Sequence, residues 1–99
     1  MADDFDELTE EQQDQKRKAE DARRTFVEDI KWLMSSPRGR RFVLWLLGKA
    51  GVYRTSFNNS GSVMAFNEGQ RNLGLMVQGE IIDICHDQFV TMLQEQRKK

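Results

Sequence analysis

Several residue types are scarce in this chain, and each scarcity excludes a class of protein. The 99 residues include one cysteine, Cys85, and one histidine, His86. A single cysteine excludes an intramolecular disulfide and fits a reducing compartment. Asp83, His86 and Asp87 share a helical face and could grip a metal weakly. No second cysteine or histidine exists to complete a zinc site. We therefore expect no metal and no cofactor.

Catalytic patterns are missing as well. Cys85 and His86 are neighbours, so on a helix their side chains point about 100° apart and cannot face one substrate together. No strand precedes the glycines of the central region, and the spacing of a phosphate-binding loop is absent. No triad, catalytic carboxylate pair or cofactor motif can be assembled. We expect a protein that is not an enzyme, with no catalytic residue.

Long apolar runs are also lacking. The longest one, residues 42–47, is far shorter than the ~20 residues that span a bilayer. The N-terminus is acidic and has neither the basic nor the apolar region of a signal peptide. We therefore expect a cytosolic protein, or one packaged into a particle assembled in a cytosol, with no membrane partner.

Charge is strongly segregated along the chain, although the formal net charge is only −1. Residues 1–20 carry eight acids and three bases, whereas residues 37–58 carry five bases and no acid. Residues 1–8 read as a disordered acidic tail. The rival interpretation is a short docking peptide with Phe5 and Leu8 as its anchors. We place a single helical domain at residues 9–99.

Helix punctuation and 3.6-residue periodicity predict an all-α fold, a small bundle of three principal helices near 9–34, 37–50 and 62–95. Thr9 begins a capping box, and Ser36 with Pro37 restarts the chain after a break. The third helix contains three glycines. We expect either a break near Gly69 or close approach of another helix, and we favour a helix over 62–69, a kink, and a longer helix to 95.

The middle helix is the most apolar segment, and we expect it to be the buried centre of the fold with Trp45 as a core residue. Trp32 lies off the apolar stripe of the first helix. It is either at the edge of the core, which we favour, or an exposed contact residue. The third helix has more than one apolar face, which favours a homo-oligomer. The candidate interface residues are Trp32, Leu75, Ile82, Phe89 and Leu93.

Cations crowd the start of the middle helix, where the helix dipole disfavours them. Carboxylates should therefore lie nearby, and Glu80, Asp83 and Asp87 are the expected partners. The alternative is a phosphate-binding surface. The cluster comprises Arg38, Arg40, Arg41, Lys49 and Arg54.

Three stretches together resemble a known family. They are Glu28–Leu33, then Gly39-Arg40-Arg41-Phe42 through Gly51-Val52 with Ser56-Phe57, and then Phe66-Asn67-Glu68-Gly69-Gln70-Arg71-Asn72-Leu73-Gly74-Leu75. Over about residues 26–93 the chain is similar to small proteins of tailed bacteriophages, the Bordetella-phage-type phage domain family. The resemblance implies a helical phage protein of the morphogenesis or virion group. The resemblance assigns no catalytic residue. It makes Glu68, Arg71 and Asn72, which belong to the family motif, candidate contact residues.

These observations lead to three functional hypotheses. The first is a non-enzymatic phage structural or assembly protein that acts through contacts with a phage or host protein, in the host cytoplasm or the virion. The second is a nucleic-acid-binding accessory that uses the basic cluster at 38–54, and nucleic acid is the weaker partner candidate. The third is a small inhibitor of a host protein.

Overall fold

The computed structural model describes residues 9–97, and three α-helices account for most of them. They are α2 (Glu10–Met34), α3 (Pro37–Ala50) and α4 (Gly61–Arg97). No strand occurs within the described range. The predicted all-α fold and its long third helix are therefore confirmed. The expected acidic tail at 1–8 lies outside the described residues.

The helix ends follow from local chemistry, as predicted. Thr9 and Gln12 form a reciprocal capping box, in which the Gln12 amide donates to the Thr9 hydroxyl and the Thr9 amide donates to the Gln12 side chain. The Ser36 hydroxyl accepts the Gly39 amide at 3.3 Å, directly before Pro37. Gly51 ends α3 with a φ of +83°, a left-handed conformation that glycine adopts without steric cost.

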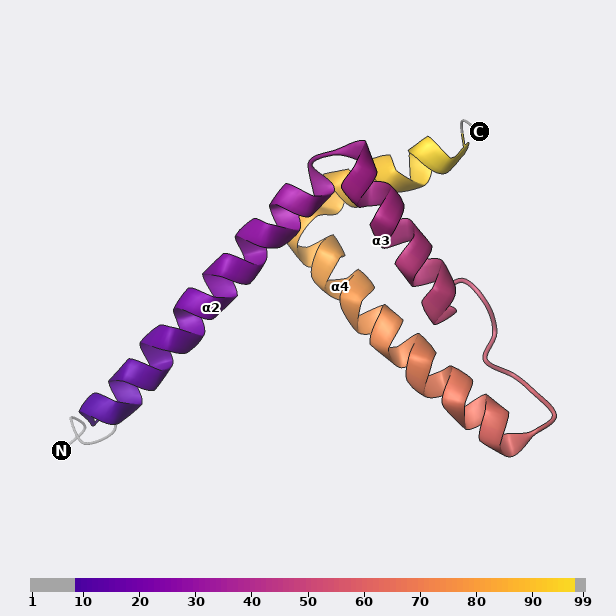
Figure 1. The fold of residues 1–99 in the computed structure, drawn as a ribbon, viewed down its shortest axis with the longest axis horizontal. Coiled ribbons are helices and arrows are strands. Elements are labelled where there is room, and N and C mark those ends of the chain that lie inside the picture. The colour runs from indigo at the N-terminus through magenta and orange to yellow at the C-terminus, as the bar shows by residue number, and fades with distance from the viewer. Residues whose placement is uncertain (1–8, 98–99) are drawn as a thin grey trace.

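The kink in α4 lies at Cys85, not near Gly69. The only non-helical residue within the described helix is Cys85, with φ −146° and ψ 67°. Residues 82–88 contain neither proline nor glycine, so no local signal marks the break. The break sends the last part of α4 across the apex of the fold (Figure 1), where Phe89 and Met92 join the core.

Close helix approach occurs at one of the three glycines expected in the third helix. A Cβ placed on Gly74 would lie 2.7 Å from the Ala50 Cβ and 2.6 Å from a Val52 methyl group. Gly69 and Gly79 face open space. A second close approach, at Gly39, was not predicted: a Cβ there would overlap the carbonyl oxygen of Leu33. The first turn of α3 therefore packs directly on the end of α2.

The molecule is open rather than compact. α2 and α4 diverge from a shared apex like the limbs of a V, and α3 lies beside α4 (Figure 1). The extents are 59 × 38 × 19 Å, with a radius of gyration of 18.9 Å. A compact chain of this length has a radius of gyration of about 13 Å. The core is correspondingly small and lies at the apex. Its buried members are Met34, Val43, Leu47, Val52, Ile81, Cys85, Phe89 and Met92.

The expectations for the two tryptophans were both wrong. α3 is buried on one face only, and Trp32 of α2 is exposed. Val43 and Leu47 are 2% and 0% exposed, whereas Trp45 is 56% exposed and contacts the Phe42 ring. Trp32 is 77% exposed, so it is not at the edge of the core. The apolar character of α3 was correctly read, but the rest of the chain is too small to cover both of its faces.

This division of α3 predicts unequal effects of two truncations. Leu47→Ala should lower the free energy of unfolding by about 2–5 kcal/mol, because it leaves a cavity in the core. Trp45→Ala should cost less than about 1 kcal/mol, because its ring is half exposed. Urea unfolding of the isolated chain measures both. A larger loss for Trp45→Ala than for Leu47→Ala would place the core on the wrong face of α3.

Candidate interaction surfaces

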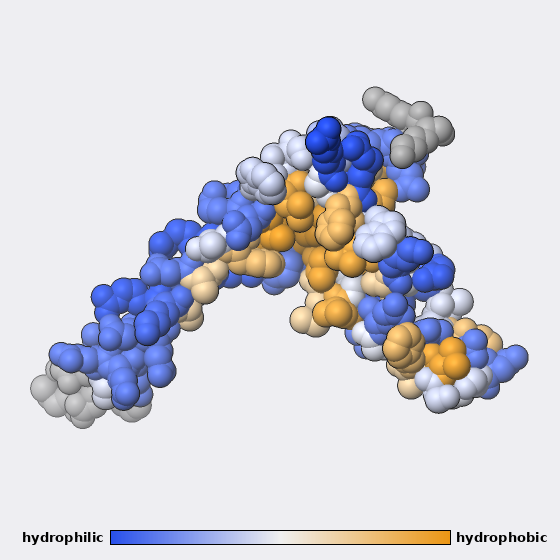
Figure 2. Space-filling view, viewed as in Figure 1, coloured by the Kyte–Doolittle hydropathy of each residue, from blue (hydrophilic) through white to orange (hydrophobic). Residues whose placement is uncertain are grey.

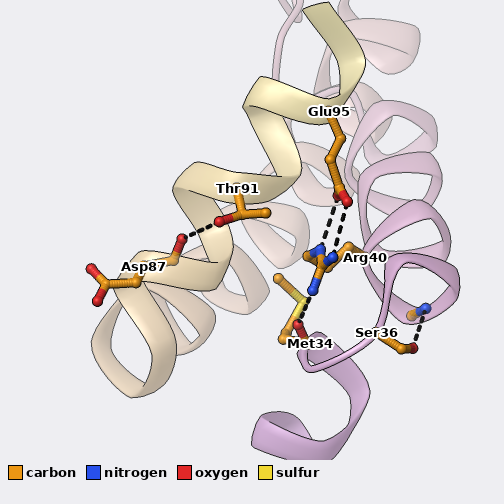
Figure 3. Close-up of polar contacts among 7 residues, drawn as sticks. Met34, Ser36, Arg40, Asp87, Thr91 and Glu95 are labelled. Atoms are coloured by element: carbon orange, nitrogen blue, oxygen red, sulfur yellow. Dashed lines mark hydrogen bonds and ion pairs between the residues drawn. The ribbon is translucent and has the colours of Figure 1, made fainter. Parts of the chain in front are cut away.

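Arg40 is the residue of the basic cluster that is buried in the fold. Its side chain is 10% exposed, and its guanidinium forms two parallel contacts of 2.9 Å with the Glu95 carboxylate (Figure 3). The remaining terminal nitrogen donates to the Met34 carbonyl oxygen at 2.9 Å. The hydrogen bond to Glu95 is the main cause that raises the pKa of Arg40. Arg40 therefore joins all three helices.

The partners predicted for the basic cluster were wrong. Glu80 contacts Arg23 of α2 at 2.6 Å, and Arg40 contacts Glu95 instead of Asp83 or Asp87. The other members, Arg38, Arg41, Lys49 and Arg54, form no ion pair with a described residue and are exposed. Four cations of the predicted cluster thus remain on the surface.

Three of these cations border a groove between α3 and the end of α4. The groove has a volume of about 680 Å³, and Arg41, Lys49 and Arg54 lie along it with Trp45 and Tyr53. Desolvation raises the pKa of the Tyr53 hydroxyl. Arg38 is not among the lining residues. A groove with free cations and two aromatic rings suits an anionic, partly apolar ligand.

The family-motif residues hold the loop that follows α3. The Ser56 hydroxyl contacts the Glu68 carboxylate, and the Asn67 side chain donates to the Ser56 carbonyl oxygen at 3.4 Å. Arg71 is half-buried, and its Nε has no hydrogen-bond partner among the described atoms. Asn72 is exposed. These contacts fix the loop against α4, and sequence reasoning had not assigned this role to the motif.

The candidate interface residues from the sequence do not lie on one surface. Phe89 is 8% exposed and belongs to the core, and Leu75 and Ile82 are partly buried against it. Trp32 and Leu93 are exposed. The apolar side chains that the fold leaves open lie mainly elsewhere. On α4 the most exposed of these are Phe66, Leu73 and Met76.

The cysteine and histidine do not form a reactive pair. Cys85 is 6% exposed, and burial raises the pKa of its thiol. His86 points to solvent and lies 3.7 Å from an Asp87 oxygen. Within residues 9–97, no group of three or more histidine, cysteine, aspartate or glutamate side chains is placed to hold a metal ion. No helix in the same range has the length and apolar character to cross a membrane.

The clamp formed by Arg40 predicts a specific loss of stability. Arg40→Gln should lower the free energy of unfolding by about 2–3 kcal/mol, less than for a fully buried pair because Glu95 is partly exposed. Arg38→Gln and Arg41→Gln are matched controls that should change it by less than about 0.5 kcal/mol. Thermal melting followed by circular dichroism compares the three. Equal effects of all three substitutions would contradict a special role for Arg40.

Comparison with protein-family models gives a match over most of the chain. A family model described as Bbp19-like phage protein matches residues 30–94. This range begins near the end of α2 and includes α3, the loop and nearly all of α4. Neither curated proteins nor solved structures give a significant match.

Proposed function

The chain belongs to the Bbp19-like phage protein family, and we propose that it is a non-enzymatic structural or virion-assembly protein that acts through protein–protein contacts. The observation that carries the proposal is the apolar surface that the fold leaves open. The whole chain, polar and apolar surface together, exposes 7938 Å². A compact monomer of this mass exposes about 5,800 Å².

The character of the excess surface supports the same proposal. Large side chains such as Trp32, Phe57 and Phe66 are 70% exposed or more. Isolated exposed apolar residues are ordinary, but contiguous ones mark interaction sites. On α3, Phe42 and Trp45 are 53% and 56% exposed, and their ring centres lie 5.9 Å apart. Exposed apolar side chains of this kind are expected of a protein that binds other proteins.

The role in assembly is tested by following the protein through infection. We expect mass spectrometry to find the chain at a fixed copy number per particle, either in purified virions or in assembly intermediates separated on a density gradient. The host-inhibitor hypothesis would be favoured if the chain is absent from both fractions and is found only unbound or bound to a host protein. The major capsid protein in the same fractions serves as the copy-number reference.

The groove at α3 supports a second candidate, a nucleic-acid-binding accessory. Arg41, Lys49 and Arg54 have no acidic partner among the described residues, and Trp45 and Tyr53 could stack on bases. The acidic residues of α2 oppose this function, because they repel phosphates. We therefore rank it second.

The two candidates differ in a binding measurement. Under the assembly proposal, the wild-type chain should not bind DNA or RNA at physiological salt. If it does bind, the triple change Arg41→Gln, Lys49→Gln and Arg54→Gln should abolish binding and reduce the salt slope by about three phosphate contacts. Arg40 must be kept, since it holds the fold together. The matched control changes three cations of α2, Arg17, Arg24 and Lys31, to glutamine.

A further inference from the structure

We propose that a second, inverted copy of this chain fills the space between α2 and α4, forming a two-fold symmetric homodimer. This inference rests on the proposed function and names the partner that binds one of the exposed surfaces. We call the space the notch. Its sides are formed on α2 by Ala19, Ala22 and Phe26, and on α4 by Phe66, Leu73 and Met76. The space-filling view shows the notch open, with apolar surface at its closed end near the apex and hydrophilic surface toward the start of α2 (Figure 2).

The α4 side of the notch follows from helical spacing. Glu80 faces α2, because its carboxylate contacts Arg23 at 2.6 Å. Leu73 and Phe66 lie seven and fourteen residues before Glu80, about two and four turns, so they share its face. Met76 lies about one turn before Glu80. Phe66, Leu73 and Met76 are 70%, 63% and 69% exposed, so none of the residues from 9 to 97 covers this stripe.

The α2 side is defined by the same contact. Ala19 and Phe26 lie about one turn on either side of Arg23, whose guanidinium lies 5.4 Å from the centre of the Phe26 ring. Phe26 is 40% exposed, and Ala19 and Ala22 are exposed. The two alanines are small, which allows another helix to approach α2 closely. Both sides of the notch are therefore apolar and open.

α2 and α4 cannot move together to close the notch without losing the contacts that join the helices at the apex. Only Ser35 and Ser36 separate α2 from α3. The Arg40 side chain holds the carbonyl oxygen of Met34, and Gly39 packs against that of Leu33. The Arg23–Glu80 pair further sets the distance between the limbs. Within residues 9–97, therefore, no segment fills the notch.

A second copy fits the notch in length and area. The 25 residues of α2 span about 37 Å, and the 24 residues of α4 before the kink span about 36 Å. When one copy is inverted, a limb of each can lie in the notch of the other. The chain exposes about 2,100 Å² more total surface, polar and apolar, than a compact monomer of its mass, and a standard interface buries ≈800 Å² per partner. One symmetric contact would cover both apolar stripes of both copies.

Sedimentation velocity of the full chain tests the proposal. At micromolar concentration the wild type should sediment as a dimer, with twice the 11.6 kDa mass of one chain. The variant Leu73→Gln with Met76→Gln should raise the dimer dissociation constant at least tenfold, because it places two polar side chains in the apolar centre of the interface. Both residues are exposed in the single chain, so the change removes no internal packing.

Trp32→Gln is the matched control. Trp32 lies nine residues after Arg23, about two and a half turns, and so projects from the opposite side of α2. Its replacement should leave the dissociation constant unchanged. A wild type that is monomeric at high micromolar concentration would overturn the proposal. So would a dimer that Trp32→Gln dissociates and the Leu73/Met76 variant does not.

A second measurement covers the case in which the double variant unfolds. The melting temperature of the wild type should rise with protein concentration if the folded state is a dimer, and a constant melting temperature would overturn the proposal. This outcome is separable from failure of the assembly function. A monomer found at fixed copy number in virions would retain that function with another protein in the notch. A stable dimer absent from virions and intermediates would refute the function but not the dimer.

Discussion

The contact on which the whole structure depends is the clamp formed by Arg40. One guanidinium holds the Glu95 carboxylate of α4 and the Met34 carbonyl oxygen of α2 while its own backbone belongs to α3. The neighbouring Gly39 brings the α3 backbone against Leu33, so the cation can reach the end of α2. The kink at Cys85 directs the end of α4 toward the same point. Because α2 meets α4 only near this apex and at the Arg23–Glu80 pair, the outer parts of α2 and α4 remain apart.

An open V is a costly shape for a single chain, since much of its apolar surface meets water. The buried core is centred on the apex and continues between α3 and α4 to Val52, and the faces of α3 and α4 that carry Trp45 and Leu73 are exposed. The same shape suits a protein that joins others, because it leaves apolar side chains such as Trp45 and Leu73 open to a partner. The open surface thus connects the clamp to the proposed function in a phage.

Local chemistry predicted the elements, and tertiary contacts decided the rest. Thr9, Ser36 and Gly51 act within a few residues, so the helix ends could be read from the sequence. The kink could not, because it depends on the burial of Phe89 and Met92 rather than on a proline or glycine. The partner of Arg40 depends on that kink, which brings Glu95 to the apex. Hydropathy showed that α3 is apolar, but not that only one face would be covered within the chain.

The most direct test of the central claim is an isotope-filtered NMR experiment on an equimolar mixture of ¹³C-labelled and unlabelled chains. Our account predicts contacts between copies at the methyl groups of Leu73 and Met76, with protons of α2 or α4 of the other chain. Contacts within one chain should meanwhile connect Met34, Val43 and Leu47 at the apex. Contacts between copies that involve Trp32 or Trp45 but neither Leu73 nor Met76 would contradict the account.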